Sequence, residues 1–232
     1  MFRFWFILPL FCIAGSVEAK TARLVTFPIP LMVENKDKGL FINLAKEISK
    51  KVDVSYEIEV LPPNKAILKF TNNDVDGIFP GLDVNMPKNA LKSVPFYSKI
   101  DFIFYRKDKP LRTIKDLEGK AVGLTFRYPY TTELTGNSRI RFSYADDDVA
   151  NIKRLSEGTI DAFVVEKLSG IKALGMSGVT GIDFDKTMPI STLNVYFAFK
   201  DNKQGRELHT KFNSVLEKMK ADGELDKILE VK

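Results

Sequence analysis

The sequence has few of the side chains from which reactive centres are built. Its 232 residues include one cysteine, one histidine and one tryptophan. Cys12 lies inside an N-terminal apolar run, so disulfides and a cysteine nucleophile are not expected in the rest of the chain. His209 alone provides neither a histidine cluster for a transition metal nor a base for the common Ser-His and Cys-His pairs. We therefore expect no catalytic residue, no metal site and no cofactor.

Charge and hydrophobicity exclude two further classes. The net charge of +5 is spread along the chain, and no basic stripe with interleaved aromatic residues indicates nucleic-acid binding. Beyond the N-terminus, no apolar stretch reaches the roughly 20 residues that a membrane-spanning helix needs. We expect a soluble monomer that binds no nucleic acid.

The N-terminus has the pattern of a secretory signal peptide. Arg3 supplies a positive charge, and residues 4–14 form an unbroken apolar run. Val17 and Ala19 have the small-residue spacing that signal peptidase recognises, so residues 1–19 are expected to be cleaved. A lipid anchor on Cys12 is not expected, because Phe11 stands where a small residue is needed. The predicted localisation is the periplasm.

The rest of the chain alternates strand and helix patterns. Residues 41–52 place apolar side chains on one helical face, and residues 56–60 alternate with the period of a half-buried strand. A second unit of the same style follows, with buried-strand patterns at residues 121–126 and 162–165. A long helix near the C-terminus is expected to stop at Gly223. This order predicts an α/β fold with largely parallel sheets and enough chain for two domains.

Five segments, in this order, resemble the type II periplasmic binding proteins of ABC importers, in particular the polar amino-acid family 3 of extracellular solute-binding proteins. They are GLFINLAKEI (residues 39–48), DGIFPGL (76–82), SVPFY (93–97), IKDLEGKAVG (114–123) and LSEGTIDAFVVE (155–166). The resemblance covers essentially the whole chain after the signal peptide.

The resemblance implies two α/β lobes joined by two crossover hinge strands, at residues 100–105 and 192–197. Residues 20–101 and 196–232 would form lobe 1, and residues 102–195 would form lobe 2. The ligand would bind between the lobes and stabilise a closed form, which an inner-membrane ABC permease reads. The alternative is one continuous sheet of about ten strands.

Members of this family hold a ligand carboxylate with an arginine on lobe 1. This chain has no arginine near the corresponding residues 86–88, where Lys88 can supply charge but not the planar fork. Lys65 resembles a basic position of divergent members, and a lysine in the first turn of a helix suggests a local anion. A solvated surface position is the alternative for both lysines. The missing arginine leaves open whether the ligand is a standard α-amino acid.

Three further candidates follow the strand at residues 121–126, at the end where this fold presents ligand contacts. They are Arg127, Tyr128 and Tyr130. Tyrosines give an apolar wall with a polar tip, although one of the two is expected to pack in the core of the lobe.

Glu166 stands where the family places an aspartate that holds an ammonium group. The alternative is a structural glutamate at a helix start, which the helix dipole would also favour. The remaining candidate contacts lie after strands of lobe 1, in segments that border the expected cleft: Phe27, Gly81 and Asp83.

Two alternatives to transport remain open. An enzyme on the same scaffold, resembling a cyclohexadienyl or prephenate dehydratase, could use Glu166 as a general acid. A ligand sensor would instead dock its closed form on a membrane receptor. We predict that the chain is not an enzyme and captures a small polar ligand, an amino acid or a related metabolite, for an ABC importer.

Overall fold

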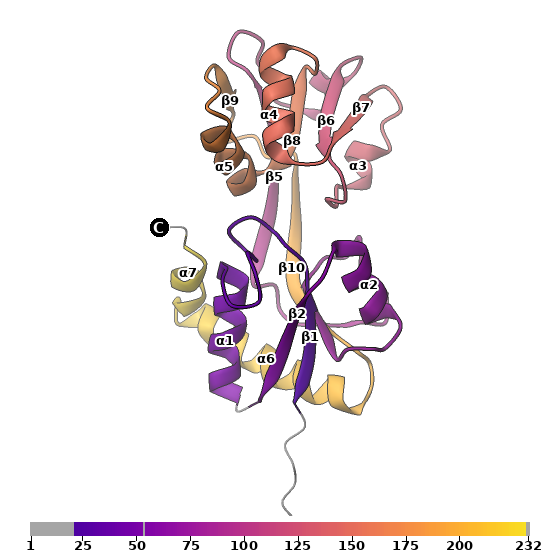
Figure 1. Ribbon diagram of the computed structural model, residues 1–232, viewed down its shortest axis with the longest axis vertical. Coiled ribbons are helices and arrows are strands. Elements are labelled where there is room, and N and C mark those ends of the chain that lie inside the picture. Colours follow the sequence, from indigo (N-terminus) through magenta and orange to yellow (C-terminus); the bar gives the residue numbers. More distant parts are fainter. Residues whose placement is uncertain (1–20, 53, 231–232) are drawn as a thin grey trace, which may run out of the picture.

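The computed structural model describes residues 21–52 and 54–230 (Figure 1). The expected signal peptide lies outside these ranges. Within them, no helix is both long and apolar enough to cross a membrane. The chain forms two α/β lobes that follow one another along the longest axis of the molecule (Figure 1).

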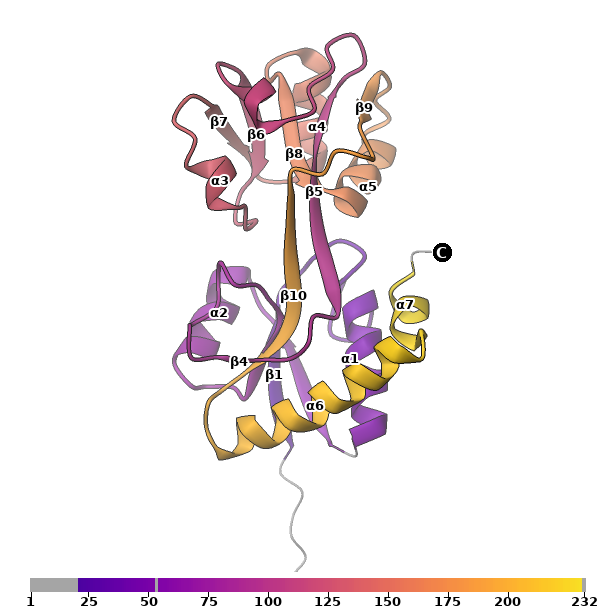
Figure 2. The same ribbon diagram turned by 180° about the vertical axis from the view of Figure 1, so that it is seen from behind.

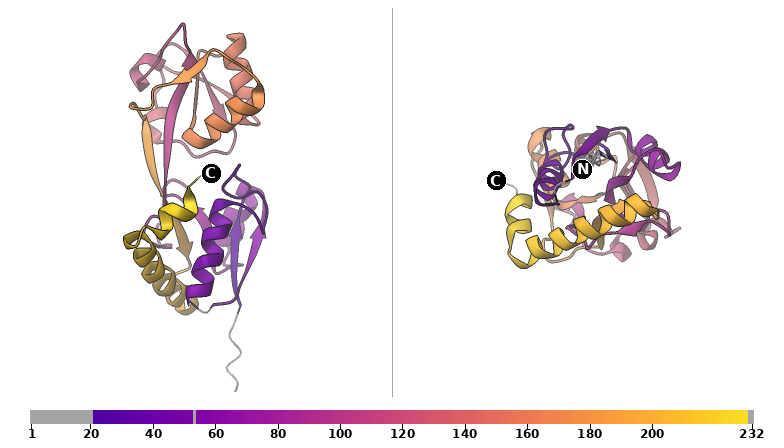
Figure 3. Two further views of the ribbon diagram at one scale, coloured as in Figure 1. Left: turned by 90° about the vertical axis from the view of Figure 1, so that its left-hand side faces the viewer. Right: turned by 90° about the horizontal axis from the view of Figure 1, so that it is seen from below.

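Lobe 1 is built from both ends of the chain. Its sheet holds three parallel strands in the order β2-β1-β3, followed by the antiparallel strand β10 (Ser191–Phe199), which also pairs with β4. Helices α6 and α7 return from lobe 2 and pack against α1 (Figures 2 and 3). The other elements of lobe 1 are β1 (Ala22–Thr26), α1 (Leu40–Val52), β2 (Tyr56–Val60), α2 (Pro63–Thr71), β3 (Gly77–Gly81), β4 (Leu91–Lys92), α6 (Lys203–Ala221) and α7 (Glu224–Leu229).

Lobe 2 is formed by the segment between the two halves of lobe 1. Its sheet has the order β5-β8-β6-β7, in which β6 runs parallel to both neighbours and β5 (Tyr97–Arg106) runs antiparallel to β8 and β9. Its other elements are η1 (Ile114–Leu117), β6 (Ala121–Thr125), α3 (Thr132–Thr135), β7 (Arg141–Ala145), α4 (Asp148–Glu157), β8 (Ala162–Glu166), α5 (Lys167–Ser177) and β9 (Ile182–Phe184).

The strands β5 and β10 run through both lobes and form an antiparallel ribbon between them (Figures 1 and 2). Residues 97–101 pair with residues 191–195, so the ribbon begins three residues before the crossover expected at residue 100. Residues 103–105 lie in the sheet of lobe 2, where β5 pairs with β8. The hydrogen-bonded ladder therefore connects ten strands, but it narrows to two strands between the lobes. The expected two-lobed fold with two hinge strands is confirmed.

The helices form where the apolar periodicity predicts them. In α1 the buried face is Phe41, Ile42, Leu44, Ala45 and Ile48, and in α6 it is Gly205, Leu208, Phe212, Leu216 and Met219. Gly223 follows α6 with a φ of 69°, which a residue without a Cβ adopts at little cost. Each lobe has its own apolar clusters, as expected of units that bury separate cores.

A buried ion pair lies in the ribbon that joins the lobes. The Lys99 ammonium contacts the Asp101 carboxylate, and these side chains are 12% and 1% exposed. Ser191, which lies opposite Asp101 in the ribbon, donates a hydrogen bond of 2.7 Å from its Oγ to the second carboxylate oxygen. Both strands are thus tied together by side chains as well as by the backbone.

We predict that Asp101→Ala destabilises the protein by about 3–5 kcal/mol, because it leaves the largely buried Lys99 ammonium without its partner. The measurement is the free energy of unfolding in urea. The matched control is Asp201→Ala, which breaks an exposed pair with Arg206 and should cost no more than about 1 kcal/mol. Equal losses in the two variants would mean that Lys99 reaches water when Asp101 is removed.

Candidate ligand-binding site

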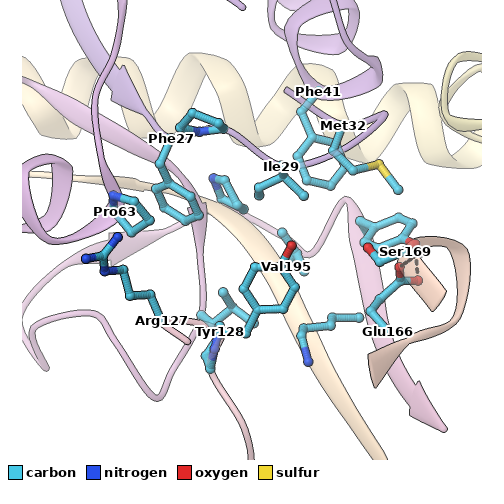
Figure 4. A pocket seen from close by; sticks show the side chains of 16 residues that line it. Phe27, Ile29, Met32, Phe41, Pro63, Arg127, Tyr128, Glu166, Ser169 and Val195 are labelled. Atoms are coloured by element: carbon cyan, nitrogen blue, oxygen red, sulfur yellow. Dashed lines mark hydrogen bonds between the residues drawn. The ribbon is translucent and has the colours of Figure 1, made fainter. Parts of the chain in front are cut away.

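A pocket lies between the lobes, beside the ribbon (Figure 4). Lobe 1 contributes Phe27, Pro28, Ile29, Met32, Phe41, Pro63, Pro80 and Leu82. The ribbon contributes Tyr97, Lys99 and Val195, and lobe 2 contributes Arg127, Tyr128, Pro129, Glu166 and Ser169. The lining therefore comes from both lobes and from both strands that connect them.

The lobe 1 wall is a folded-back loop between β1 and α1. The peptide groups of Ile29 and Val33 bond to each other across a tight turn, which places Ile29 and Met32 on the pocket. Gly39 lets the loop return to α1, because its φ is 134° and a Cβ there would stand 2.3 Å from the Met32 carbonyl oxygen. The Phe41 N–H then bonds to the same oxygen, at 2.9 Å, and fixes the start of the helix.

Arg127 provides a cation on the lobe 2 side. It follows β6 in a turn and has a φ of 66°, a conformation that costs a residue with a Cβ about 1–2 kcal/mol. Its side chain is exposed and forms no ion pair with a carboxylate among the described residues. In Figure 4 it lies at the opposite end of the pocket from Glu166, with Tyr128 between them. A strained, exposed cation at a pocket is typical of a binding function.

Glu166 ends β8 and caps the N-terminus of α5. One of its carboxylate oxygens accepts a bond of 2.9 Å from the Ser169 N–H, and the other accepts one of 3.0 Å from the Tyr97 hydroxyl (Figure 4). Glu166 is only 8% exposed. Burial, and then the neighbouring Glu166 carboxylate, raises the pKa of Tyr97 well above its usual value, so the tyrosine stays a donor. The two readings of Glu166, structural cap and pocket residue, are therefore compatible.

A buried acid stands behind the tyrosine wall. Asp148, the first residue of α4, is 7% exposed and accepts a bond of 2.5 Å from the Thr125 hydroxyl. Burial raises the pKa of Asp148 to about 6, against the lowering effect of the Thr125 bond. Burial, followed by the charge of Asp148, also raises the pKa of Tyr128. A second hollow, lined by Asp148, adjoins the pocket and shares Tyr128 and Ser169 with it.

Four of the residues singled out in the sequence line the pocket: Phe27, Arg127, Tyr128 and Glu166. Tyr130 does not, because its hydroxyl turns into the core of lobe 2, where it accepts from the Thr125 N–H at 2.9 Å and donates to the Val164 carbonyl at 3.4 Å. The expectation that one of the two tyrosines packs in the core is confirmed.

The other four lie outside the lining. Lys65 is exposed, because a side chain two residues after Pro63 points about 200° around the helix from the one that meets the pocket. Lys88 is an exposed loop residue, which agrees with the alternative of a solvated surface position. Gly81 alternates with the lining residues Pro80 and Leu82, so it faces the other side of its strand.

Asp83 is occupied elsewhere on lobe 1. Its carboxylate accepts from the Tyr196 hydroxyl at 3.0 Å and contacts the Lys92 ammonium. These partners lower the pKa of Asp83, the Lys92 contact having the larger effect.

Sequence reasoning missed most of the remaining lining. Met32 and Phe41 reach the pocket only because the loop folds back at Gly39. Tyr97 lies in the SVPFY segment, and the hydrogen bond that brings it to Glu166 joins residues 69 positions apart. Among the described residues no group of three or more His, Cys, Asp or Glu side chains is placed to hold a metal ion.

Two α/β lobes, two crossover strands and a pocket between the lobes define a ligand-binding protein of the type II periplasmic class. Residues 26–231 match the family model of bacterial extracellular solute-binding proteins, family 3. The chain belongs to this family, which confirms the resemblance of its sequence segments.

Related proteins cover nearly the whole chain. A protein of Vibrio harveyi provisionally named amino-acid ABC transporter-binding protein PatH is 27% identical over 93% of this chain and 90% of its own length. An ancestral arginine-binding protein bound to arginine shares the fold with a TM-score of 0.69, at 21% identity over 90% of this chain and 96% of its own. The GluR0 ligand-binding core in complex with L-glutamate has a TM-score of 0.76, at 12% identity over 91% and 97% of the two chains.

We predict that Asp148→Asn stabilises the protein at neutral pH. A carboxyl with a pKa near 6 in the folded protein and about 3.8 in the unfolded chain binds more protons when folded, so its contribution to stability falls as the pH rises from about 4 to about 6. The asparagine carbonyl can still accept from Thr125. The difference in the free energy of unfolding between the variant and the wild type should therefore grow by up to about 3 kcal/mol in favour of the variant between pH 4 and pH 7.

The measurement is urea unfolding at both ends of this pH range. The control is Asp146→Asn, because Asp146 is exposed two residues away and should show no such growth. A gain that is the same at both pH values would contradict the raised pKa of Asp148.

Proposed function

We propose that this protein captures an amino acid or a related small metabolite between its lobes and delivers it to an inner-membrane ABC permease. The observation that carries the proposal is the pocket itself, whose lining comes from both lobes and from both connecting strands. A ligand in such a pocket contacts both lobes only when they are close together, so it shifts the population towards the closed form. The closed form is what a permease would recognise.

The charges of the pocket suit a zwitterion. Arg127 offers a planar fork for a carboxylate, and Glu166 still has lone pairs for an ammonium group. Helix α2 begins at the pocket with Pro63 and has no side-chain cap, so the positive end of its dipole adds to the attraction for an anion. In this proposal Arg127, on lobe 2, holds the ligand carboxylate, which is the role that the family resemblance assigns to an arginine on lobe 1.

The supporting comparisons agree with transport. The family is one of solute-binding proteins, and PatH carries the name of an amino-acid ABC transporter-binding protein. We propose that the chain works as a periplasmic monomer after removal of residues 1–19, without catalysing a reaction. The lobe boundaries at 101/102 and 195/196 are part of the proposal, since Asp101 and Val195 end the stretch in which the two strands pair with each other.

The test is a calorimetric and thermal-shift screen of the chain without residues 1–19 against amino acids, polyamines and organic acids. A ligand that binds only the folded protein raises the melting temperature by mass action. Solution scattering should show a smaller radius of gyration with that ligand. Absence of binding across the screen would contradict the proposal, and conversion of prephenate would favour the enzyme instead.

We predict that Arg127→Gly weakens the affinity for a carboxylate ligand found in that screen by about 10- to 100-fold, since a charge-assisted hydrogen bond is lost. The same substitution should not lower the melting temperature of the free protein, because glycine adopts a φ of 66° readily. The matched control is Asn73→Gly, which makes the same backbone change at a φ of 66° outside the pocket. Undiminished affinity in Arg127→Gly would remove Arg127 from the site.

A further inference from the structure

The lobe 1 side of the pocket carries no polar side chain. All eight residues that lobe 1 contributes are phenylalanine, isoleucine, leucine, methionine or proline, and none has a nitrogen or oxygen in its side chain that can bond. Met32 and Phe41 are 3% and 2% exposed and belong to the main core of the lobe, so this wall is also rigid. Apart from the backbone N–H groups at the start of α2, which no side chain caps, lobe 1 therefore gives a ligand side chain only apolar side chains to contact.

The charged groups of the pocket number three, and none is left over for a charged side chain. Lys99 is committed to Asp101 within the ribbon. Arg127 and Glu166 stand at the carboxyl ends of the neighbouring parallel strands β6 and β8, so they can hold the α-carboxylate and the α-ammonium group of one ligand once the exposed Arg127 side chain turns from the far end of the pocket towards Glu166. A further charge on the ligand would then be buried against the apolar wall without a partner, which is costly. An amide would likewise lose its hydrogen bonds to water on the lobe 1 side.

The charged residues of lobe 1 that lie close in sequence to the lining residues do not provide a partner for a charged ligand side chain. Lys65 and Lys88 are exposed outside the lining, and Asp83 is engaged by Lys92 and Tyr196. The wall is therefore apolar in its second layer as well, where Leu44 and Phe96 lie in the same core cluster.

We infer that the ligand is an amino acid with an apolar side chain, held by its charged α-groups on lobe 2 and by its side chain on the wall of lobe 1. The inference rests on the proposed function and names its substrate class. It narrows the expectation from the sequence, which was a small polar ligand, an amino acid or a related metabolite, to amino acids whose side chain is apolar. In this arrangement lobe 2 recognises charge, and lobe 1 selects by shape and hydrophobicity.

One feature beside the site would instead favour an amino acid with a long cationic side chain. Asp146, Asp147 and Asp148 line the hollow behind Tyr128, and a long cationic side chain passing Tyr128 would reach them. Asp147 is engaged as the cap of α4, through the Ala150 N–H at 2.7 Å, and Asp148 is bonded to Thr125. Tight binding of arginine or lysine would show that this second route is used, and it would overturn the inference.

The experiment compares ligands of matched length by calorimetry. Across alanine, norvaline and norleucine, each methylene that is buried should tighten binding about fourfold. Methionine should bind at least about tenfold more tightly than glutamine, which has a similar length but a polar end. Tighter binding of glutamine, glutamate, arginine or lysine than of methionine would overturn the inference while leaving the proposed function intact. Failure of every amino acid to bind would overturn the inference, and failure of the polyamines and organic acids as well would overturn the proposed function.

A wall variant separates side-chain contact from general damage. Ile29→Ala should weaken the affinity for norleucine by about fourfold or more and leave the affinity for alanine nearly unchanged, because only the longer side chain reaches the wall. The matched control is Leu68→Ala on α2, a residue that is 57% exposed and outside the lining, which should alter neither affinity. Equal weakening of alanine and norleucine by Ile29→Ala would show that the wall does not contact the side chain and would overturn the assignment.

Discussion

The ribbon of β5 and β10 is the constraint on which the site depends, because it links two separate cores and also lines the pocket between them. Its backbone pairs residues 97–101 with 191–195, and the hydrogen bond from the Ser191 hydroxyl on β10 to the buried Asp101 carboxylate on β5 adds a side-chain link between the two strands. Tyr97 stands at the lobe 1 end of the ribbon, packs edge-on against Phe41 at 5.4 Å between ring centroids, and donates to Glu166 of lobe 2. Bending of the ribbon therefore changes the pocket directly, and a ligand in the pocket acts directly on the hinge.

The structural role of Glu166 as a helix cap is compatible with the binding role that we propose for the same carboxylate. Capping α5 uses one oxygen and the Tyr97 hydroxyl uses the other, yet each carboxylate oxygen accepts more than one bond. A ligand ammonium group can add a bond without breaking those two. The carboxylate is then held in place before the ligand arrives, which limits the entropy lost on binding. The helix-start alternative considered from the sequence and the ligand-contact reading describe the same geometry.

The sequence predicted the architecture better than the site. Strands and helices follow from periodicity, and five family-like segments gave two lobes with two crossovers. Lining residues were predicted correctly where they end a strand or closely follow one at the cleft, as Glu166 and Arg127 do, and their contact with a ligand stays a prediction. They were missed or misplaced where the answer depends on which way a side chain turns: Lys65 is two residues past Pro63, Gly81 lies between two lining residues, and Tyr130 turns back into the core. Position along the chain fixes the end of an element, but tertiary packing fixes its face.

Each wall of the pocket has a turn with a strained backbone, and the two turns present different kinds of side chain. Leu31 (φ 69°) and Arg127 (φ 66°) are two of the non-glycine residues with positive φ among those the structure describes. Arg127 lines the pocket from lobe 2, and Leu31 immediately precedes the lining residue Met32 of lobe 1. In lobe 1 the strained Leu31 turn serves packing, because it presents Ile29 and Met32 as an apolar surface. In lobe 2 the strained Arg127 and the buried acid Asp148 flank Tyr128, on the side of the pocket that we propose recognises charge. Strain persists only where surrounding contacts over-determine it, and both turns are attached to rigid cores. In the proposed closure, the apolar wall and the charged wall would therefore each be fixed before they meet, and the ribbon would be the element that bends.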